Sequence, residues 1–268
     1  MKDQSFDFPV SLQPIFTRSG VQVPRARAVV RDDLDRPMSV VSDRYSLYTH
    51  KEVMNAVQPF VRELGKSEVS YSLEKEGARL VATHTFKDVS IKVPTGHNNY
   101  DGTPRSVGDV IALQINVINS YNRSTSLEFE LGGLVLRCLN GMTMFDEFFH
   151  LRYAHLAESW DRQLPKPEVI MRALQKTEGK LQQWGEQDLD RYQREELVQT
   201  GIKLQLFPKR FVEKNIHRFN NAETVWDLYN AFTYVVTHGS VRMQQSGKLN
   251  RFDRVNRLFR SVLEPTAA

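Results

Sequence analysis

The spacing of apolar residues changes near residue 141, from the alternation typical of strands to the three- and four-residue spacing of helices. Leu127, Phe129 and Leu131 alternate with glutamates, which gives a strand one buried and one solvated face. From Glu168 to Thr200, apolar residues recur at helical intervals. This change predicts an α+β protein with a twisted antiparallel sheet in its N-terminal half and packed helices in its C-terminal half.

The same change suggests three segments. We predict an N-terminal arm at residues 1–37, a β-rich core with one helix at residues 38–142, and a helical part at residues 143–268 that packs on the same domain. No internal repeat interrupts this order.

The one helix of the β-rich core has clear end signals. Thr49 and Glu52 have the spacing of a capping box, and apolar residues follow at helical intervals from Val53 to Leu64. Gly65 then stands where a terminating glycine is expected. The sequence therefore predicts a helix that begins after Thr49 and ends at Gly65.

The other elements are predicted from alternation, turn residues and helical spacing. Strands are expected at 38–48 (a pair, or one bent strand), 69–73, 79–86, 89–93, 109–119 and 126–138, with a hairpin turn at 120–125. Residues 94–108 are rich in Gly, Asn and Pro and predict a loop. The chain is expected to turn at Asn140-Gly141, and helices are expected at 168–200, 225–236 and 251–263.

Cysteine content and hydropathy limit the cellular setting. Cys138 is the single cysteine, so an intramolecular disulfide and a cysteine-rich zinc site are both excluded, and a reducing compartment fits best. The first residues lack the basic start and apolar run of a signal peptide. No run of 18 apolar residues occurs either. We expect a cytoplasmic protein that does not contact a membrane.

Positive charge is concentrated near the C-terminus. The whole chain has a net charge of +4, yet the residues from Gly201 onward include eleven Lys and Arg against five Asp and Glu. Such an asymmetry is typical of a surface that faces phosphates. The predicted nucleic-acid-binding residues are Lys203, Lys209, Arg210, Lys214, Arg242, Lys248, Arg251, Arg254, Arg257 and Arg260, together with Arg123 from the 120–125 turn.

Two features of this basic region have a structural alternative. The arginines from Arg251 to Arg260 recur every three residues, and they could simply be the solvated side of an amphipathic helix. Phe207 and Phe211 lie among the lysines and could stack on bases. They could equally belong to the core.

Catalytic motifs are missing from the sequence. It contains no G-x-S-x-G, phosphate-binding loop or dinucleotide fingerprint. The strongest metal candidate comprises Asp146, Glu147, His150 and His155. Its histidines are five residues apart, whereas a helical zinc pair is four apart. The acidic runs at 32–35 and 186–190 are typical of solvated faces. We expect no enzyme, no cofactor and no metal site.

Four segments, in this order, resemble the phage- and plasmid-borne family known as domain of unknown function 932. They are Val41-Ser42-Asp43-Arg44-Tyr45, Asn119-Ser120-Tyr121-Asn122-Arg123-Ser124, Arg137-Cys138-Leu139-Asn140-Gly141-Met142, and Trp226-Asp227-Leu228-Tyr229-Asn230-Ala231 with the following Thr237-His238. The second segment departs from the family's usual Asn-Ser-His-Asp-Gly-Ser at Tyr121, Asn122 and Arg123. The resemblance implies a role in single-strand DNA handling, recombination or evasion of host defence.

Three functions follow as hypotheses. The first is a DNA-metabolism protein of a phage or mobile element that binds single-stranded DNA in the host cytoplasm, with annealing or recombination activity and homo-oligomers. The second is a module that binds a host protein and counters a defence or replication factor. The third is a metal-dependent nuclease.

Overall fold

The computed structural model of the chain describes residues 6–93, 108–136, 140–143, 150–156, 164–207, 209–239 and 244–263. These residues form two compact units. The first unit comprises Met1–His84, Ile115–Glu130 and Phe148–Pro167, and the second comprises Thr85–Gln114, Leu131–Glu147 and Glu168–Ala268. The α+β prediction is confirmed, because antiparallel sheets occupy the N-terminal half and packed helices the C-terminal half. That residues 143–268 pack on the same domain as the sheet stays a prediction.

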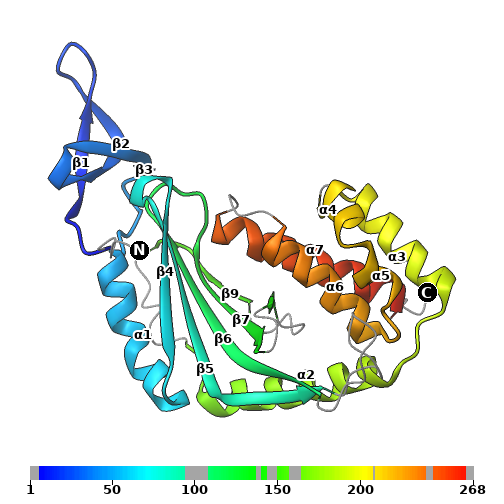
Figure 1. The fold of residues 1–268 in the computed structure, drawn as a ribbon. Coiled ribbons are helices and arrows are strands. Elements are labelled where there is room, and N and C mark those ends of the chain that lie inside the picture. The colour runs from blue at the N-terminus through cyan, green and yellow to red at the C-terminus, as the bar shows by residue number, and fades with distance from the viewer. Residues whose placement is uncertain are drawn as a thin grey trace, which may run out of the picture. The chain divides into compact units, whose positions relative to one another are not determined.

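A small antiparallel sheet begins the first unit and extends from the predicted N-terminal arm into the segment beyond it (Figure 1). Its strands are β1 (Val10–Phe16), β2 (Gln22–Arg31) and β3 (Arg36–Ser42), in that spatial order. The inner end of the sheet is anchored by a core of Phe8, Val29, Val41 and Tyr121. The sequence predicted only part of β3, and the chain leaves the sheet after Ser42 without a second strand.

Helix α1 (His50–Leu64) has the predicted bounds. The Thr49 hydroxyl accepts a hydrogen bond from the Glu52 backbone N–H at 3.1 Å, and the Glu52 carboxylate accepts from the Thr49 N–H at 2.8 Å. The capping box is therefore confirmed. Figure 1 shows α1 running alongside β4 (Glu68–Glu74).

A larger sheet contains β4, β5 (Arg79–Val93), β6 (Asp109–Ser120), β7 (Leu127–Val135) and β8 (Asn140–Thr143) in that order, and β9 (His150–Tyr153) also pairs with β7. Strand β5 (Arg79–Val93) is continuous where two strands were predicted. The predicted hairpin is confirmed, because β6 (Asp109–Ser120) and β7 (Leu127–Val135) flank its turn. The loop predicted at 94–108 lies, except for its last residue, outside the described residues.

Two short strands correct the prediction for the segment after β7. Strand β8 (Asn140–Thr143) pairs with β7, so that Asn140 lies opposite Val135 and Gly141 opposite Leu134. The predicted turn at Asn140-Gly141 is therefore wrong, because both residues lie within a strand. Strand β9 (His150–Tyr153) occupies a position where helix was expected. Four residues are too few to show a period of their own.

Helices follow from Pro167 onward. They are α2 (Pro167–Glu186), α3 (Arg191–Lys203), α4 (Lys209–Lys214), α5 (Ile216–Asn220), α6 (Val225–His238) and α7 (Gln245–Leu263). The helical segment predicted at 168–200 is two helices, since Asp190 caps a new start through a hydrogen bond from the Gln193 N–H at 2.8 Å. Among the described helices, none combines the length and apolarity needed to span a bilayer.

The helices of the second unit pack around an aromatic core. Phe232 of α6 lies edge-on to Phe207 and Phe259, each at a ring-centroid distance of 5.2 Å. Such edge-to-face pairs contribute about 0.5–1.5 kcal/mol beyond the burial of their area. A Cβ atom on Gly201 would lie 2.7 Å from Cε1 of Phe232. Glycine is therefore required where α3 meets α6.

Candidate nucleic-acid interface

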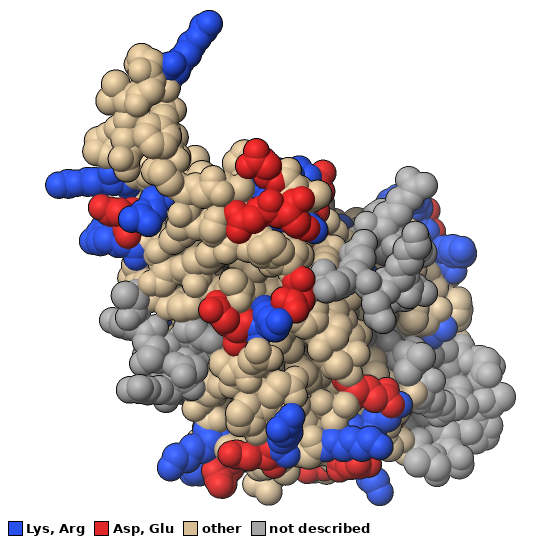
Figure 2. Space-filling view, turned by 90° about the vertical axis from the view of Figure 1, so that its left-hand side faces the viewer, with Lys and Arg blue, Asp and Glu red and all other residues tan. Residues whose placement is uncertain are grey.

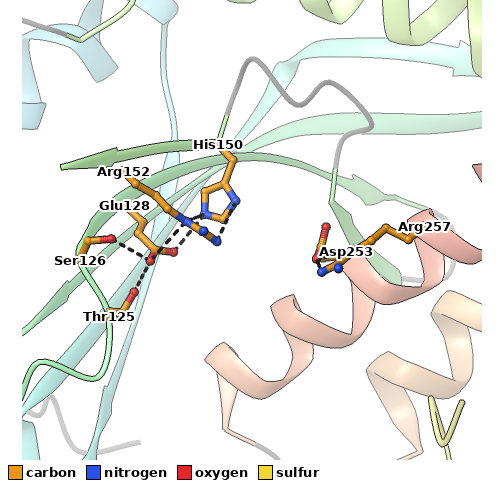
Figure 3. A network of polar contacts seen from close by, with 7 residues as sticks. All are labelled: Thr125, Ser126, Glu128, His150, Arg152, Asp253 and Arg257. Carbon is orange, nitrogen blue, oxygen red and sulfur yellow. Dashed lines mark hydrogen bonds and ion pairs between the residues drawn. The ribbon is translucent and has the colours of Figure 1, made fainter. Parts of the chain in front are cut away.

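The arginines of α7 are largely occupied within their own unit. Arg254 donates a hydrogen bond to the carbonyl of Leu204, the residue that follows α3 and caps its C-terminus. Arg257 is turned toward Asp253, one helical turn earlier, and forms an ion pair with it (Figure 3). Arg251 is half-buried, and burial together with the neighbouring Arg254 lowers its pKa. Arg254 and Arg257 therefore have structural contacts as well as charge.

A more exposed set of cations lies at the end of α3 and on α4. We call it the basic patch, and it consists of Lys203, Lys209, Arg210 and Lys214, all exposed. Its one acidic neighbour on α4 is Glu213, which lies 3.7 Å from the Lys209 ammonium. Lys203 and Lys214 form no ion pair with another described residue. The basic patch can therefore accept an external anion without breaking a strong internal contact.

The two phenylalanines near the basic patch have different surroundings. Phe207 is buried against Phe219 and Phe232, so the core interpretation is confirmed for it. Phe211 is half-buried, and the Arg210 guanidinium carbon lies 5.3 Å from its ring centroid. This cation–π pair holds a planar guanidinium at the surface.

The remaining predicted binding residues are dispersed. Lys248 is half-buried on α7, and Arg260 is also half-buried. Arg242 lies outside the described residues. Arg123 belongs to the first unit, whereas the other predicted residues belong to the second. Arg123 has a left-handed backbone with φ of 57° and donates to the Val40 carbonyl at 3.3 Å.

The Asn119–Ser124 segment surrounds a buried histidine in the first unit. The Nε2 atom of His50 lies 3.0 Å from the Gly77 carbonyl, which can only accept, so this nitrogen carries the proton. The Asn119 side-chain amide donates to Nδ1 of His50 at 3.0 Å. The ring of Tyr121 stacks on His50 at 4.1 Å. Burial lowers the pKa of His50 to about 4, so the ring is neutral at physiological pH.

A second polar cluster lies where β9 pairs with β7 (Figure 3). The Glu128 carboxylate accepts hydrogen bonds from Nε2 of His150 at 3.0 Å, from the Ser126 hydroxyl at 3.1 Å and from the Thr125 hydroxyl. Arg152 lies 3.7 Å away. Burial favours the neutral acid, but the hydrogen bonds from His150 and Thr125 leave the pKa of Glu128 below its usual value. The hydrogen bond from His150 to the Glu128 carboxylate therefore connects β9 to β7.

The predicted metal group is not assembled among the described residues. His150 faces Glu128, whereas His155 stacks on Tyr45 at 4.9 Å and lies 3.3 Å from the Ser46 carbonyl through Nδ1. Asp146 and Glu147 lie outside the described residues. No cluster of three or more His, Cys, Asp or Glu suited to a metal occurs in the described part of the chain.

The Trp226–Ala231 segment forms a buried polar contact in the second unit. Trp226 and Asn230, four residues apart on α6, each donate to the same oxygen of Asp109 at 2.9 Å. All three side chains are buried. Every residue of the Trp226–Ala231 segment is buried, so the segment belongs to the core of the second unit. The spacing of Trp226 and Asn230 indicates a shared helix face, but no sequence signal identifies Asp109 as their partner.

These features define an α+β protein whose recognisable sequence segments mainly organise its core and which carries exposed cations at the end of α3 and on α4. The chain matches the family model described as domain of unknown function (DUF932) over residues 37–259. It therefore belongs to that family. No curated protein and no solved structure matches it.

Proposed function

We propose that this protein binds single-stranded DNA through the basic patch. The observation that carries the proposal is the exposure of Lys203, Arg210 and Lys214. The one acidic residue within α4, Glu213, is already paired with Lys209. Cations of this kind bind a phosphate backbone by releasing its condensed counterions. Because they contact phosphates and not base edges, we expect little sequence preference.

The arrangement on α4 favours a single strand over a duplex. A planar guanidinium held over a half-buried aromatic ring, as in Arg210 and Phe211, can stack on an unpaired base. Bases in a duplex are already stacked on one another and do not offer that face.

The family resemblance extends the proposal to a biological setting. Its implied setting is DNA metabolism in a phage or mobile element, within the host cytoplasm. Annealing or recombination would follow if several copies assembled along one strand. Both statements depend on the resemblance and are separate from the binding proposal.

A binding titration with labelled oligonucleotides tests the proposal. Fluorescence anisotropy would compare single-stranded DNA, duplex DNA and RNA of equal length. We expect the variant Lys203→Gln, Arg210→Gln, Lys214→Gln to bind single-stranded DNA at least about tenfold more weakly than the unmodified chain. The matched control is Arg191→Gln, because Arg191 is exposed on α3 but paired with Glu195 at 2.8 Å. The control should bind within about twofold of the unmodified chain.

Two outcomes would contradict the proposal and favour another function. Capture of a host protein without any nucleic-acid affinity would favour the protein-binding module. Strand cleavage that requires magnesium or manganese, and that is abolished by joint substitution of Asp146→Ala and Glu147→Ala, would favour the nuclease.

A further inference from the structure

The outer end of the β1–β2 hairpin is ordered by its own hydrogen bonds. We call residues 14–27 the hairpin tip. The Thr17 N–H donates to the Val21 carbonyl at 2.8 Å, and the Gly20 N–H donates to the Thr17 carbonyl at 2.9 Å. The Thr17 hydroxyl accepts from the Val21 N–H at 3.1 Å. Gly20 has φ of 82°, a conformation that glycine adopts without strain. The hairpin tip therefore has a defined shape.

This order is not explained by a core. The side chains of Phe16 and Val21, on either side of the turn, are 56% and 62% exposed. The core of the same sheet lies at its inner end, around Val29 and Val41. Binding residues are found disproportionately on loops held by a rigid scaffold, so these exposed apolar side chains are available to a partner.

The charge of the hairpin tip indicates the chemistry of that partner. Arg18, Arg25 and Arg27 are all exposed, and residues 8–31 include no Asp or Glu. In Figure 2 a Lys or Arg side chain stands clear of the surface at the outer end of this sheet. The register brings Asp43 beside Arg25, but the Asp43 side chain forms no ion pair with a described residue.

The opposite end of the same sheet has the reverse character. The β2–β3 turn includes Asp32, Asp33 and Asp35 around Leu34, which is 58% exposed. Asp33 pairs with Arg31 at 2.8 Å. The three carboxylates still outnumber the two flanking arginines, Arg31 and Arg36. One sheet thus presents an exposed apolar residue in a basic setting at one end and in an acidic setting at the other. A polyanion would approach the hairpin tip and avoid the β2–β3 turn.

We infer that the hairpin tip is a second nucleic-acid contact, in which the arginines bind phosphates and Phe16 lies against a base or sugar. This inference rests on the proposed function and adds a separate surface to it. An ordered hairpin loses little conformational entropy on binding. Strands β1 and β2 contain no carboxylate that would compete with phosphates for these arginines.

Site-specific photocrosslinking locates the contact directly. The photoreactive amino acid p-benzoylphenylalanine would replace Phe16 in one full-length variant and Leu34 in a control variant, and each would be irradiated with labelled single-stranded DNA. The two positions have similar exposure but opposite surroundings. We expect a protein–DNA adduct at Phe16→p-benzoylphenylalanine that is at least about tenfold stronger than at the Leu34 control.

A charge variant provides the second readout. Arg18→Gln with Arg27→Gln should weaken DNA binding and lower the slope of log affinity against log salt by about 1.4, at about 0.7 for each phosphate of a single strand that the variant no longer neutralises. Unchanged affinity together with no adduct at position 16, in a protein that still requires the basic patch, would overturn this inference alone. Absence of DNA binding by the unmodified chain would overturn it together with the proposed function. A crosslink between two protein chains instead of a protein–DNA adduct would show that the hairpin tip is a self-association surface, and this result would also overturn the inference.

Discussion

The buried imidazole of His50 predicts that the first unit loses stability in mild acid. The ring is enclosed by Phe8, Tyr121 and the Gly77 carbonyl, and its one free lone pair accepts from Asn119. A proton added to Nδ1 would have to break that last hydrogen bond inside the core. Burial accordingly lowers the pKa of His50 from 6.5 to about 4.

The sign and size of the effect follow from these two values. Between pH 6.5 and pH 4 the unfolded chain binds a proton that the folded chain excludes, so stability falls as the pH falls through this range and is fully present above it. One pKa unit corresponds to about 1.4 kcal/mol. The loss attributable to His50 between pH 7 and pH 4.5 is therefore about 2–3 kcal/mol.

The test compares the unmodified chain with His50→Gln, which keeps an amide donor and acceptor but does not titrate. Hydrogen–deuterium exchange of α1, corrected for intrinsic rates, measures the opening free energy of the first unit. Tryptophan fluorescence does not isolate this unit, because Trp184 and Trp226 belong to the second. We expect His50→Gln to lose about 2–3 kcal/mol less than the unmodified chain between pH 7 and pH 4.5.

Other histidines determine the acid sensitivity that remains in His50→Gln and provide a control substitution. Burial also lowers the pKa of His84 and of His155, so His50→Gln should reduce the acid sensitivity without abolishing it. His217 is exposed and lies in the second unit, so His217→Gln serves as the control substitution for the opening of α1. Identical profiles for His50→Gln and the unmodified chain would refute the argument that burial keeps this ring neutral.

Two further sites, Asp109 and Gly201, test packing in the second unit by urea denaturation, with tryptophan fluorescence as the probe. Asp109→Ala leaves two buried donors of α6 without an acceptor and should lower the free energy of unfolding by about 2–6 kcal/mol. Asp109→Asn keeps an acceptor and should lower it less. Equal losses for the two variants would contradict the acceptor role of Asp109. Gly201→Ala places a Cβ atom 2.7 Å from Phe232 and should lower the free energy of unfolding by about 1–3 kcal/mol. The control is Gly179→Ala, which has open space around it and should stabilise its helix. Equal effects of the two substitutions would show that Phe232 can move.

Elements with local signals could be predicted from the sequence. The capping box of Thr49 and Glu52 and the alternation from Leu127 to Leu131 are complete within a few consecutive residues. Helix α6 was likewise predicted from the helical spacing of its apolar residues. These signals gave the α1 bounds, the β6–β7 hairpin and α6 because local preference and tertiary packing agree there.

Other elements depend on contacts that no local pattern shows. Strands β1 and β2 show weak alternation because the hairpin tip has no core to fill. The role of Arg254 depends on a carbonyl at Leu204 that is distant in sequence. By contrast, Asp253 and Arg257 are four residues apart on one helix, a spacing at which opposite charges pair. This ion pair could therefore have been predicted from the sequence. The sequence therefore predicted where cations concentrate, but it could not separate exposed cations from those that support the fold.

The salt dependence of single-stranded DNA affinity tests the central claim most directly. It would be measured for the unmodified chain and for the variant Lys203→Gln, Arg210→Gln, Lys214→Gln, with circular dichroism to verify folding. If these three side chains contact phosphates, the variant's slope of log affinity against log salt should be shallower by about 2, at about 0.7 for each phosphate. Equal slopes for two folded proteins would contradict the claim that the basic patch binds DNA.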